Sequence, residues 1–194
     1  MKQADKKLHE KLWASAQQLR ANSSLKLNEV SEPILGLIFL KFADVRFQKA
    51  KKELEYERTN IISDSGSTRV RPLSADSFKA KGVLFVPENA TYSYLMSLSE
   101  NENMGNALNE AMRLIEEHNS DLAGILPQNY TSLVKTVSKN DELLITLLKS
   151  FNQIPDDISG DAFGGIYEYF LGQFALAEGQ NGGEFFTEIG RAHV

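Results

Sequence analysis

The stretch ILGLIFLKFADVRF, residues Ile34–Phe47, decides the fold expected of this chain. Apolar side chains occupy nearly every position, so a helix formed from it is apolar on most sides. Such a helix is usually buried among other helices, and we predict that it is the central helix of a small bundle. Ser31 is expected to cap it, with Pro33 in its first turn. The charged residues 48–57, QKAKKELEYE, should continue the helix.

Apolar residues spaced three and four apart predict further helices of the bundle. Two such helices are expected over Met104–His118 and Asp141–Phe151. An earlier one is indicated by an apolar stripe beside Trp13, formed by Leu8, Leu12, Ala16 and Leu19. Together with the central helix, these segments predict a mainly α N-terminal domain covering residues 1–151.

Two segments of this domain lack helical periodicity. Residues 58–82 are rich in Ser, Asp, Gly and Pro and are predicted to form a loop of roughly 25 residues, a length typical of functional or disordered loops. Val83–Pro87, VLFVP, combines β-branched and aromatic residues, which fits either a short strand or an extended entry to the next helix. A short strand pair therefore stays possible within the helical domain.

A second unit is expected to follow a linker at residues 152–160, where Pro, Asp and Gly gather. Asp161 can cap a helix there, and Gly179 is a plausible stop. Gly182–Gly183 then form a flexible approach to an aromatic pair. The expected buried stripe of this helix consists of Ile166, Tyr167, Phe170, Leu171, Phe174 and Ala175.

Composition excludes several classes of protein. The sequence has no apolar run long enough to span a membrane and no signal-like N-terminus. The absence of cysteine excludes disulfides and thiolate metal sites and suits a reducing cytoplasm. The net charge is −5, whereas a stand-alone DNA-binding protein usually carries a basic face. If the chain meets DNA, we expect it to do so with partners.

The residues that could carry out catalysis are few. His9, His118 and His193 are scattered and are expected to be ordinary surface histidines, so no metal site is predicted. The glycines at 160, 164 and 165 fit neither a phosphate-binding loop nor a dinucleotide fingerprint. Taken alone, these residues do not form an active site.

Four blocks, in order along the chain, resemble the methylase subunit of type I restriction–modification systems. They are LWASAQQLRANSSL (12–25), PILGLIFLKFADVRF (33–47), LFVPENATYSYL (84–95) and GDAFGGIYEYFLGQFALAEGQNGGEFFT (160–187). The resemblance implies the family's N-terminal helical domain, followed at residues 161–187 by the first helix and cofactor-pocket segment of an α/β methyltransferase domain. That domain is a doubly wound sheet with its ligand sites at the carboxyl ends of the strands.

The resemblance also implies a function. Members of the family transfer a methyl group from S-adenosyl-methionine to the exocyclic amine of adenine in double-stranded DNA, after extruding the base from the stack. They work with a specificity subunit, a second methylase subunit and a restriction subunit. By position, Glu184, Phe185, Phe186 and Thr187 correspond to the family segment that forms one wall of the cofactor pocket. An aromatic wall suits the cationic sulfonium of the cofactor.

The sequence departs from the family pattern immediately after Thr187. Glu188 stands where the family has proline, and the Asn-Pro-Pro-aromatic motif that binds the target amine is absent, so no catalytic residue is assigned. We expect this chain to be inactive alone. EIGRAHV, residues 188–194, is expected to be a non-native tail, since its codons can match a common sequencing adapter. A natural short protein with its own C-terminus is the alternative.

Two functions stay open. The resemblance implies that the helical domain contacts DNA and the specificity subunit, with Ile34–Phe47 and residues 58–82 as candidates, although core packing is the simpler explanation of the helix. The alternative is a non-catalytic helical module for protein–protein interaction. In the methylase interpretation, the stripe from Ile166 to Ala175 should lack its main packing surface without the α/β domain. It would then be less protected from hydrogen exchange than Leu12–Phe151.

Overall fold

The computed structural model describes residues 3–21, 27–65, 72–98, 102–136 and 142–177. Within these residues the chain forms α-helices and short 3-10 turns, and no strand. The predicted mainly helical fold is therefore confirmed for this part of the chain. Val83–Pro87 is an extended segment that leads into a 3-10 turn, η1 (Glu88–Ala90), so the second of its two predicted forms is the correct one.

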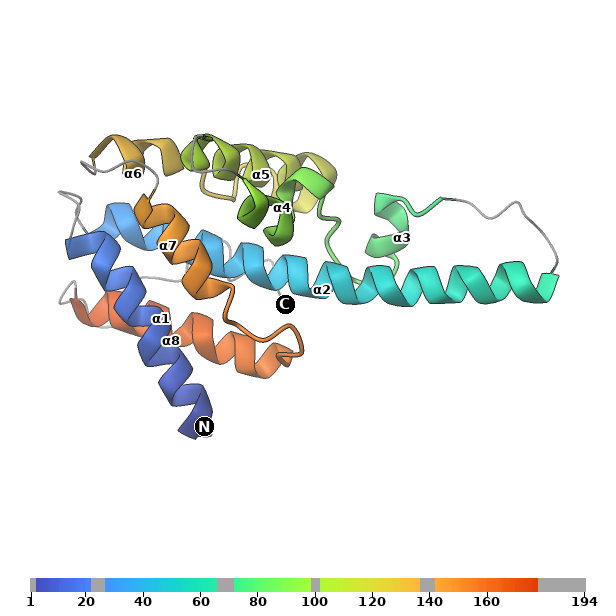
Figure 1. The fold of residues 1–194 in the computed structure, drawn as a ribbon, viewed down its shortest axis with the longest axis horizontal. Coiled ribbons are helices and arrows are strands. Elements are labelled where there is room, and N and C mark those ends of the chain that lie inside the picture. The colour runs from blue at the N-terminus through green and yellow to red at the C-terminus, as the bar shows by residue number, and fades with distance from the viewer. Residues whose placement is uncertain (1–2, 22–26, 66–71, 99–101, 137–141, 178–194) are drawn as a thin grey trace.

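The helix α2 (Leu27–Ser65) is the axis of the fold (Figure 1). Between residues 33 and 45 every position except Phe42 is buried, which confirms the central helix predicted from the apolar run. Its predicted start is wrong. Ser31 is buried inside the helix rather than capping it, because the fully buried Val30 extends the packed face by another turn. Pro33 lies within the helix, where it removes only one backbone hydrogen bond.

Two groups of helices pack around α2 (Figure 1). The first contains α1 (Gln3–Ala21), α7 (Glu142–Phe151) and α8 (Gly160–Ala177). The second contains α4 (Tyr92–Ser97), α5 (Met104–His118) and α6 (Tyr130–Thr136). Buried residues from both groups belong to one continuous apolar core that includes α2.

The helices predicted from periodicity are confirmed. The α5 helix begins and ends where predicted, and Asn103 caps it by accepting a hydrogen bond from the backbone N–H of Asn106 at 2.8 Å. The α7 helix is described from Glu142, and the predicted first residue, Asp141, lies outside the described residues. In α1 the predicted Leu12 and Ala16 are buried, whereas the side chain of Leu19 lies outside the described residues.

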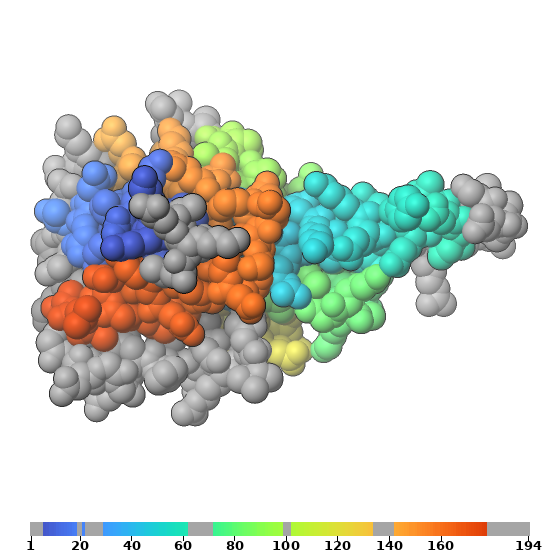
Figure 2. Space-filling model, turned by 90° about the horizontal axis from the view of Figure 1, so that it is seen from below, coloured from blue at the N-terminus to red at the C-terminus, as the bar shows by residue number. Residues whose placement is uncertain are grey.

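The long loop predicted at residues 58–82 is wrong at residues 58–65 and 75–79, which are helical. The sequence up to Ser65 has no proline or glycine to end the helix, so α2 continues and its outer part projects from the bundle (Figures 1 and 2). A short helix, α3 (Ala75–Lys79), then packs back on α2. Its Phe78 ring lies 4.6 Å from that of Phe47 between centroids, and Lys81 pairs with Glu57 at 2.6 Å.

The C-terminal helix α8 is capped by Ser159 rather than by the predicted Asp161. The hydroxyl oxygen of Ser159 accepts from the backbone N–H of Ala162 at 3.2 Å, which places Asp161 inside the first turn. The helix is described as far as Ala177, so the predicted stop at Gly179 lies outside the described residues.

The expectation that α8 lacks a packing surface is wrong. Phe170 and Phe174 are fully buried, and the Trp13 ring of α1 meets both edge-on, with centroids 5.4 and 5.0 Å away. Phe163 stacks on Phe42 of α2 at 4.0 Å. Figure 2 shows α8 lying alongside α1 across the underside of the molecule. The helix is part of the same core as the helices before it.

A pair of glycine substitutions tests the packing of α2 against the 127–130 segment. A Cβ at Gly36 would overlap the ring of Pro127 and lie 2.6 Å from the hydroxyl of Tyr130, which is held by its hydrogen bond to the Pro33 carbonyl at 2.9 Å. We expect Gly36→Ala to lower the free energy of unfolding by about 1–3 kcal/mol. Chemical denaturation measures it.

Gly172→Ala is the matched control, because nothing lies within 4 Å of its added Cβ on the exposed side of α8. The greater helix propensity of alanine should there raise the free energy of unfolding by about 0.5–1 kcal/mol. Equal effects of the two substitutions would contradict the close approach at Gly36.

Candidate functional site: the seam between α2 and α8

The residues predicted to line a cofactor pocket, Glu184, Phe185, Phe186 and Thr187, lie outside the described residues, and their role stays a prediction. The candidate site within the described chain is the seam where α2 faces α8. It contains an apolar recess, a larger polar hollow beside it, and a buried lysine.

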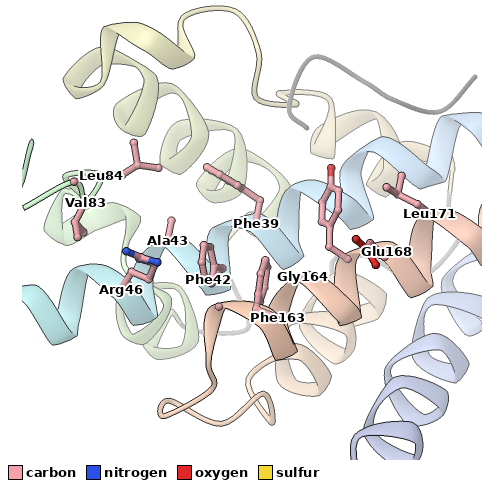
Figure 3. Close-up of a pocket in the computed structure, with 13 residues that line it drawn as sticks. Phe39, Phe42, Ala43, Arg46, Val83, Leu84, Phe163, Gly164, Glu168 and Leu171 are labelled. Carbon is pink, nitrogen blue, oxygen red and sulfur yellow. The ribbon is translucent and has the colours of Figure 1, made fainter. Parts of the chain in front are cut away.

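The apolar recess has a volume of about 510 Å³ and is shown in Figure 3. Its centre is the stacked pair Phe42 and Phe163, whose rings lie 4.0 Å apart and 16° from parallel. Around this pair the lining comes from α2, α8 and the extended segment before η1, including Phe39, Tyr167, Leu171, Val83 and Leu84. An aromatic surface of this kind fits an apolar side chain or a planar group.

Two exposed charges stand at the recess. The guanidinium of Arg46 lies over the Phe42 ring, 5.5 Å from its centroid, and Glu168 comes from α8 (Figure 3). The lining holds no histidine, serine, cysteine or lysine; most of it is apolar, and its polar side chains are those of Arg46, Tyr167 and Glu168. The recess therefore has the character of a packing surface rather than of a catalytic centre.

The polar hollow adjoins the recess and shares Phe42, Arg46, Val83 and Gly160 with it. Its volume is about 1090 Å³. Both basic and acidic side chains line it: Lys41, Arg46, Lys49, Lys52 and Lys81, together with Asp44, Glu53, Asp156 and Asp157. This mixture of charges makes the hollow an unfavourable surface for binding a phosphate backbone.

Lys41 is a charged residue inside the apolar run of α2, and its side chain is only 5% exposed. Its ammonium lies 3.0 Å from a carboxylate oxygen of Asp156 and 3.3 Å from the amide oxygen of Asn152. It also lies over the ring of Tyr92, 5.2 Å from the centroid. Sequence reasoning missed this cluster, although a lysine flanked by apolar residues was a visible signal.

Asp44 and Tyr92 extend the polar cluster one turn along α2. Burial raises the pKa of the Asp44 carboxyl, while hydrogen bonds from Gln48 and from the backbone N–H of Tyr92 oppose that shift. Burial also raises the pKa of the Tyr92 hydroxyl, which donates to the carbonyl of Leu148 at 3.3 Å. The cluster thus connects α2 with α4 and α7 through polar groups inside the core.

The histidine prediction is wrong for His9. Its side chain is buried, with the ring 5.2 Å from that of Tyr169, because α8 covers this side of α1. His118 is exposed as predicted, and His193 lies outside the described residues. The described residues contain no group of acidic, histidine or cysteine side chains that could hold a metal ion. None of the described helices is both long and apolar enough to cross a membrane.

The apolar run Ile34–Phe47 was a candidate for partner contacts, but most of its side chains are buried in the core. Only Arg46 is exposed, and Phe42 is half-buried. Core packing, the simpler of the two explanations, accounts for the run.

Comparison with known protein families gives matches to two regions of the chain. The HsdM N-terminal domain family matches residues 8–151, well over half of the chain. The chain belongs to this family. A second family, N-6 DNA Methylase, matches residues 158–190 and so includes α8 of this HsdM chain. The seam between α2 and α8 therefore lies between the two matched regions.

One curated relative of this HsdM chain is the type I restriction enzyme MjaIX methylase subunit of Methanocaldococcus jannaschii. It is 30% identical over 185 residues, an alignment that covers 91% of this chain and 32% of the relative. The chain thus spans about a third of the length of the relative it matches.

The raised pKa of Asp44 predicts a pH effect on the stability of this HsdM domain. A carboxyl whose pKa is raised on folding favours the folded state most when protonated, and this contribution is lost as the pH rises through its folded pKa. Asp44→Asn removes the titration and keeps the shape. The stability of the variant relative to wild type should therefore increase from acidic to neutral pH.

Urea denaturation at a series of pH values measures this difference. Glu53→Gln, at an exposed residue of the same hollow, is the control and should show a smaller change with pH. A pH profile of Asp44→Asn parallel to that of the wild type would contradict the prediction.

Proposed function

We propose that this chain is the N-terminal part of an adenine-specific DNA methyltransferase subunit of a type I restriction–modification system. The observation that carries the proposal is the order of the two family matches on one chain, the helical domain first and the methylase region directly after it. The matched relative, a type I methylase subunit, supports the same assignment. The domain division at residues 1–151, 152–160, 161–187 and 188–194 is part of the proposal.

The reaction is transfer of a methyl group from S-adenosyl-methionine to the exocyclic amine of adenine. Glu184, Phe185, Phe186 and Thr187 would supply one wall of the cofactor pocket. The acceptors for the target amine would come from a motif that this sequence does not contain. The isolated chain should consequently be unable to methylate DNA.

The proposed partners are a specificity subunit, a second methylase subunit, a restriction subunit and double-stranded DNA, in the cytoplasm. The net charge of −5 and the mixed charge of the polar hollow support a complex in which this chain is not the main source of affinity for DNA. Affinity for the phosphate backbone comes largely from counterion release at basic surfaces. Partners would then provide much of the affinity for DNA.

We also propose that the remainder of the methylase domain packs into the apolar recess. Phe163, Tyr167 and Leu171 line it from α8, inside the N-6 DNA methylase match, and Phe39 and Phe42 line it from the helical domain. The recess is thus formed jointly by both matched regions. An apolar recess of this size at a boundary between domains is suited to interdomain packing.

The proposed catalytic function is tested by sequencing the gene beyond codon 187 and assaying the protein that it encodes. The frame beyond codon 187 should continue into a methylase domain with an Asn-Pro-Pro-aromatic motif. The protein expressed from that frame should transfer labelled methyl groups to adenine in DNA when its specificity subunit is present. The 194-residue chain is the negative control. A genuine stop codon after residue 194, with no methylase frame behind it, would defeat the proposal.

Gly164→Leu tests the recess in the extended protein. Nothing lies within 4 Å of a Cβ at Gly164, which lines the recess, so leucine can be accommodated while its side chain fills the space. In the 194-residue chain the variant should fold with undiminished stability. In the extended protein it should lower methylation at least several-fold and lower the thermal midpoint. Gly172→Ala, away from the recess, is the control, and unchanged activity of Gly164→Leu would exclude the recess as the docking surface.

A non-catalytic helical interaction module is the second candidate. One observation favours it: Ile166, Phe170 and Phe174 of α8 are buried in the core of the helical domain, so most of the apolar stripe is covered without a further domain. Co-expression with a type I specificity subunit separates the candidates. Purification of the 194-residue chain without any such complex, together with a stop codon in the gene, would favour the module.

A further inference from the structure

The connector between α7 and α8 joins the two matched regions of the chain and runs past the buried end of Lys41. Tight turns shape it, with backbone bonds from Ile154 to the Phe151 carbonyl at 3.0 Å and from Ile158 to the Pro155 carbonyl at 3.2 Å. Asn152 and Asp156 stand on these turns and direct their oxygens at the Lys41 ammonium. A residue of the central helix thus binds the connector at two points.

The two sides of this contact differ sharply in exposure. The side chain of Lys41 is 5% exposed, whereas that of Asp156 is 87% exposed. A buried ammonium without a carboxylate is strongly unfavourable, while an exposed carboxylate without its ammonium is well solvated by water. Moving the connector away from Lys41 would therefore cost far more free energy at the lysine, which would keep a buried charge without its partner, than at Asp156, which water would solvate.

Methionine has nearly the length of lysine and would fill the same space in the core without a charge to satisfy. Replacing a buried ion pair with apolar groups is often neutral for stability or raises it. Stability alone gives no reason for lysine at residue 41. Lysine instead makes the contact depend on geometry. Its ammonium keeps these hydrogen bonds only when the side-chain oxygens of Asn152 and Asp156 lie next to it, beside the Tyr92 ring.

We propose that Lys41 is a positioning residue that fastens the connector to α2 and thereby sets where α8 and the methylase region begin. Ile154, which is buried, gives the connector an apolar contact with the core, and Lys41 fixes its direction toward the Ser159 cap. The contact between Lys41 and the connector lies within the 194-residue chain itself. Its consequence for methyl transfer rests on the proposed function.

Hydrogen exchange on the 194-residue chain tests the fastening. Asp156→Ala and Lys41→Met should each speed exchange of the amides at residues 152–163 about tenfold, because the connector opens locally. Amides of α5 should be unaffected. Asp157→Ala removes a neighbouring exposed carboxylate outside the Lys41 contact and is the matched control. Unchanged exchange at the connector would overturn the proposal, as would an equal increase throughout the chain.

Denaturation of the double variant provides a second test. Asp156→Ala leaves the buried ammonium without the carboxylate that lies 3.0 Å from it and with only the longer-range charge of Asp44, so adding Lys41→Met should restore a large part of the lost stability. The double variant should therefore be more stable than Asp156→Ala alone, while its connector stays open to exchange. Additive losses of stability would show that the two side chains do not act as a pair and would overturn the proposal.

In the extended methylase, Lys41→Met and Asp156→Ala should lower the rate of methylation by a similar factor. Asp157→Ala should methylate DNA at the wild-type rate. If the wild-type extended protein is itself inactive, the proposed function fails, and the exchange experiment still decides whether Lys41 fastens the connector. Full methylation by both variants alongside an opened connector would overturn the link between fastening and catalysis.

Discussion

Between Pro33 and Val45, α2 is buried on nearly every side, so other helices must cover it all round. Removing apolar side chains from water is the main favourable term in folding, and thirteen consecutive positions cannot be covered by one neighbour. The requirement is met by α1, α7 and α8 on one side and by the α4–α6 group on the other. The arrangement of the described chain follows from this requirement.

The same requirement joins two regions that belong to different family matches. Because α8 supplies Phe163, Phe170 and Phe174 to the core around α1 and α2, the start of the methylase match is fastened to the helical domain. The linker predicted between the two units is a set of tight turns with one buried isoleucine and an ion pair, rather than a free tether. A rigid seam of this kind can hold a fixed angle between domains.

Polar groups inside the core add direction to this packing. Apolar contacts tolerate sliding and repacking, whereas a buried ammonium or carboxylate accepts only partners in suitable geometry. Lys41 and Asp44 lie three residues apart on α2 and contact the connector, Gln48 and the start of α4. Together they specify how these segments are arranged, and the apolar residues around them supply most of the stability.

The sequence by itself determined the helices that repeat with a clear period of 3.6 residues, such as Met104–His118, and the burial of the Ile34–Phe47 run. Those features depend on local spacing. The tertiary structure alone decided the continuation of α2 to Ser65, where α3 packs on it, and the burial of His9 beneath α8. It also decided the seam, because the recess and the Lys41 contact join residues more than a hundred positions apart, whose proximity no local pattern records.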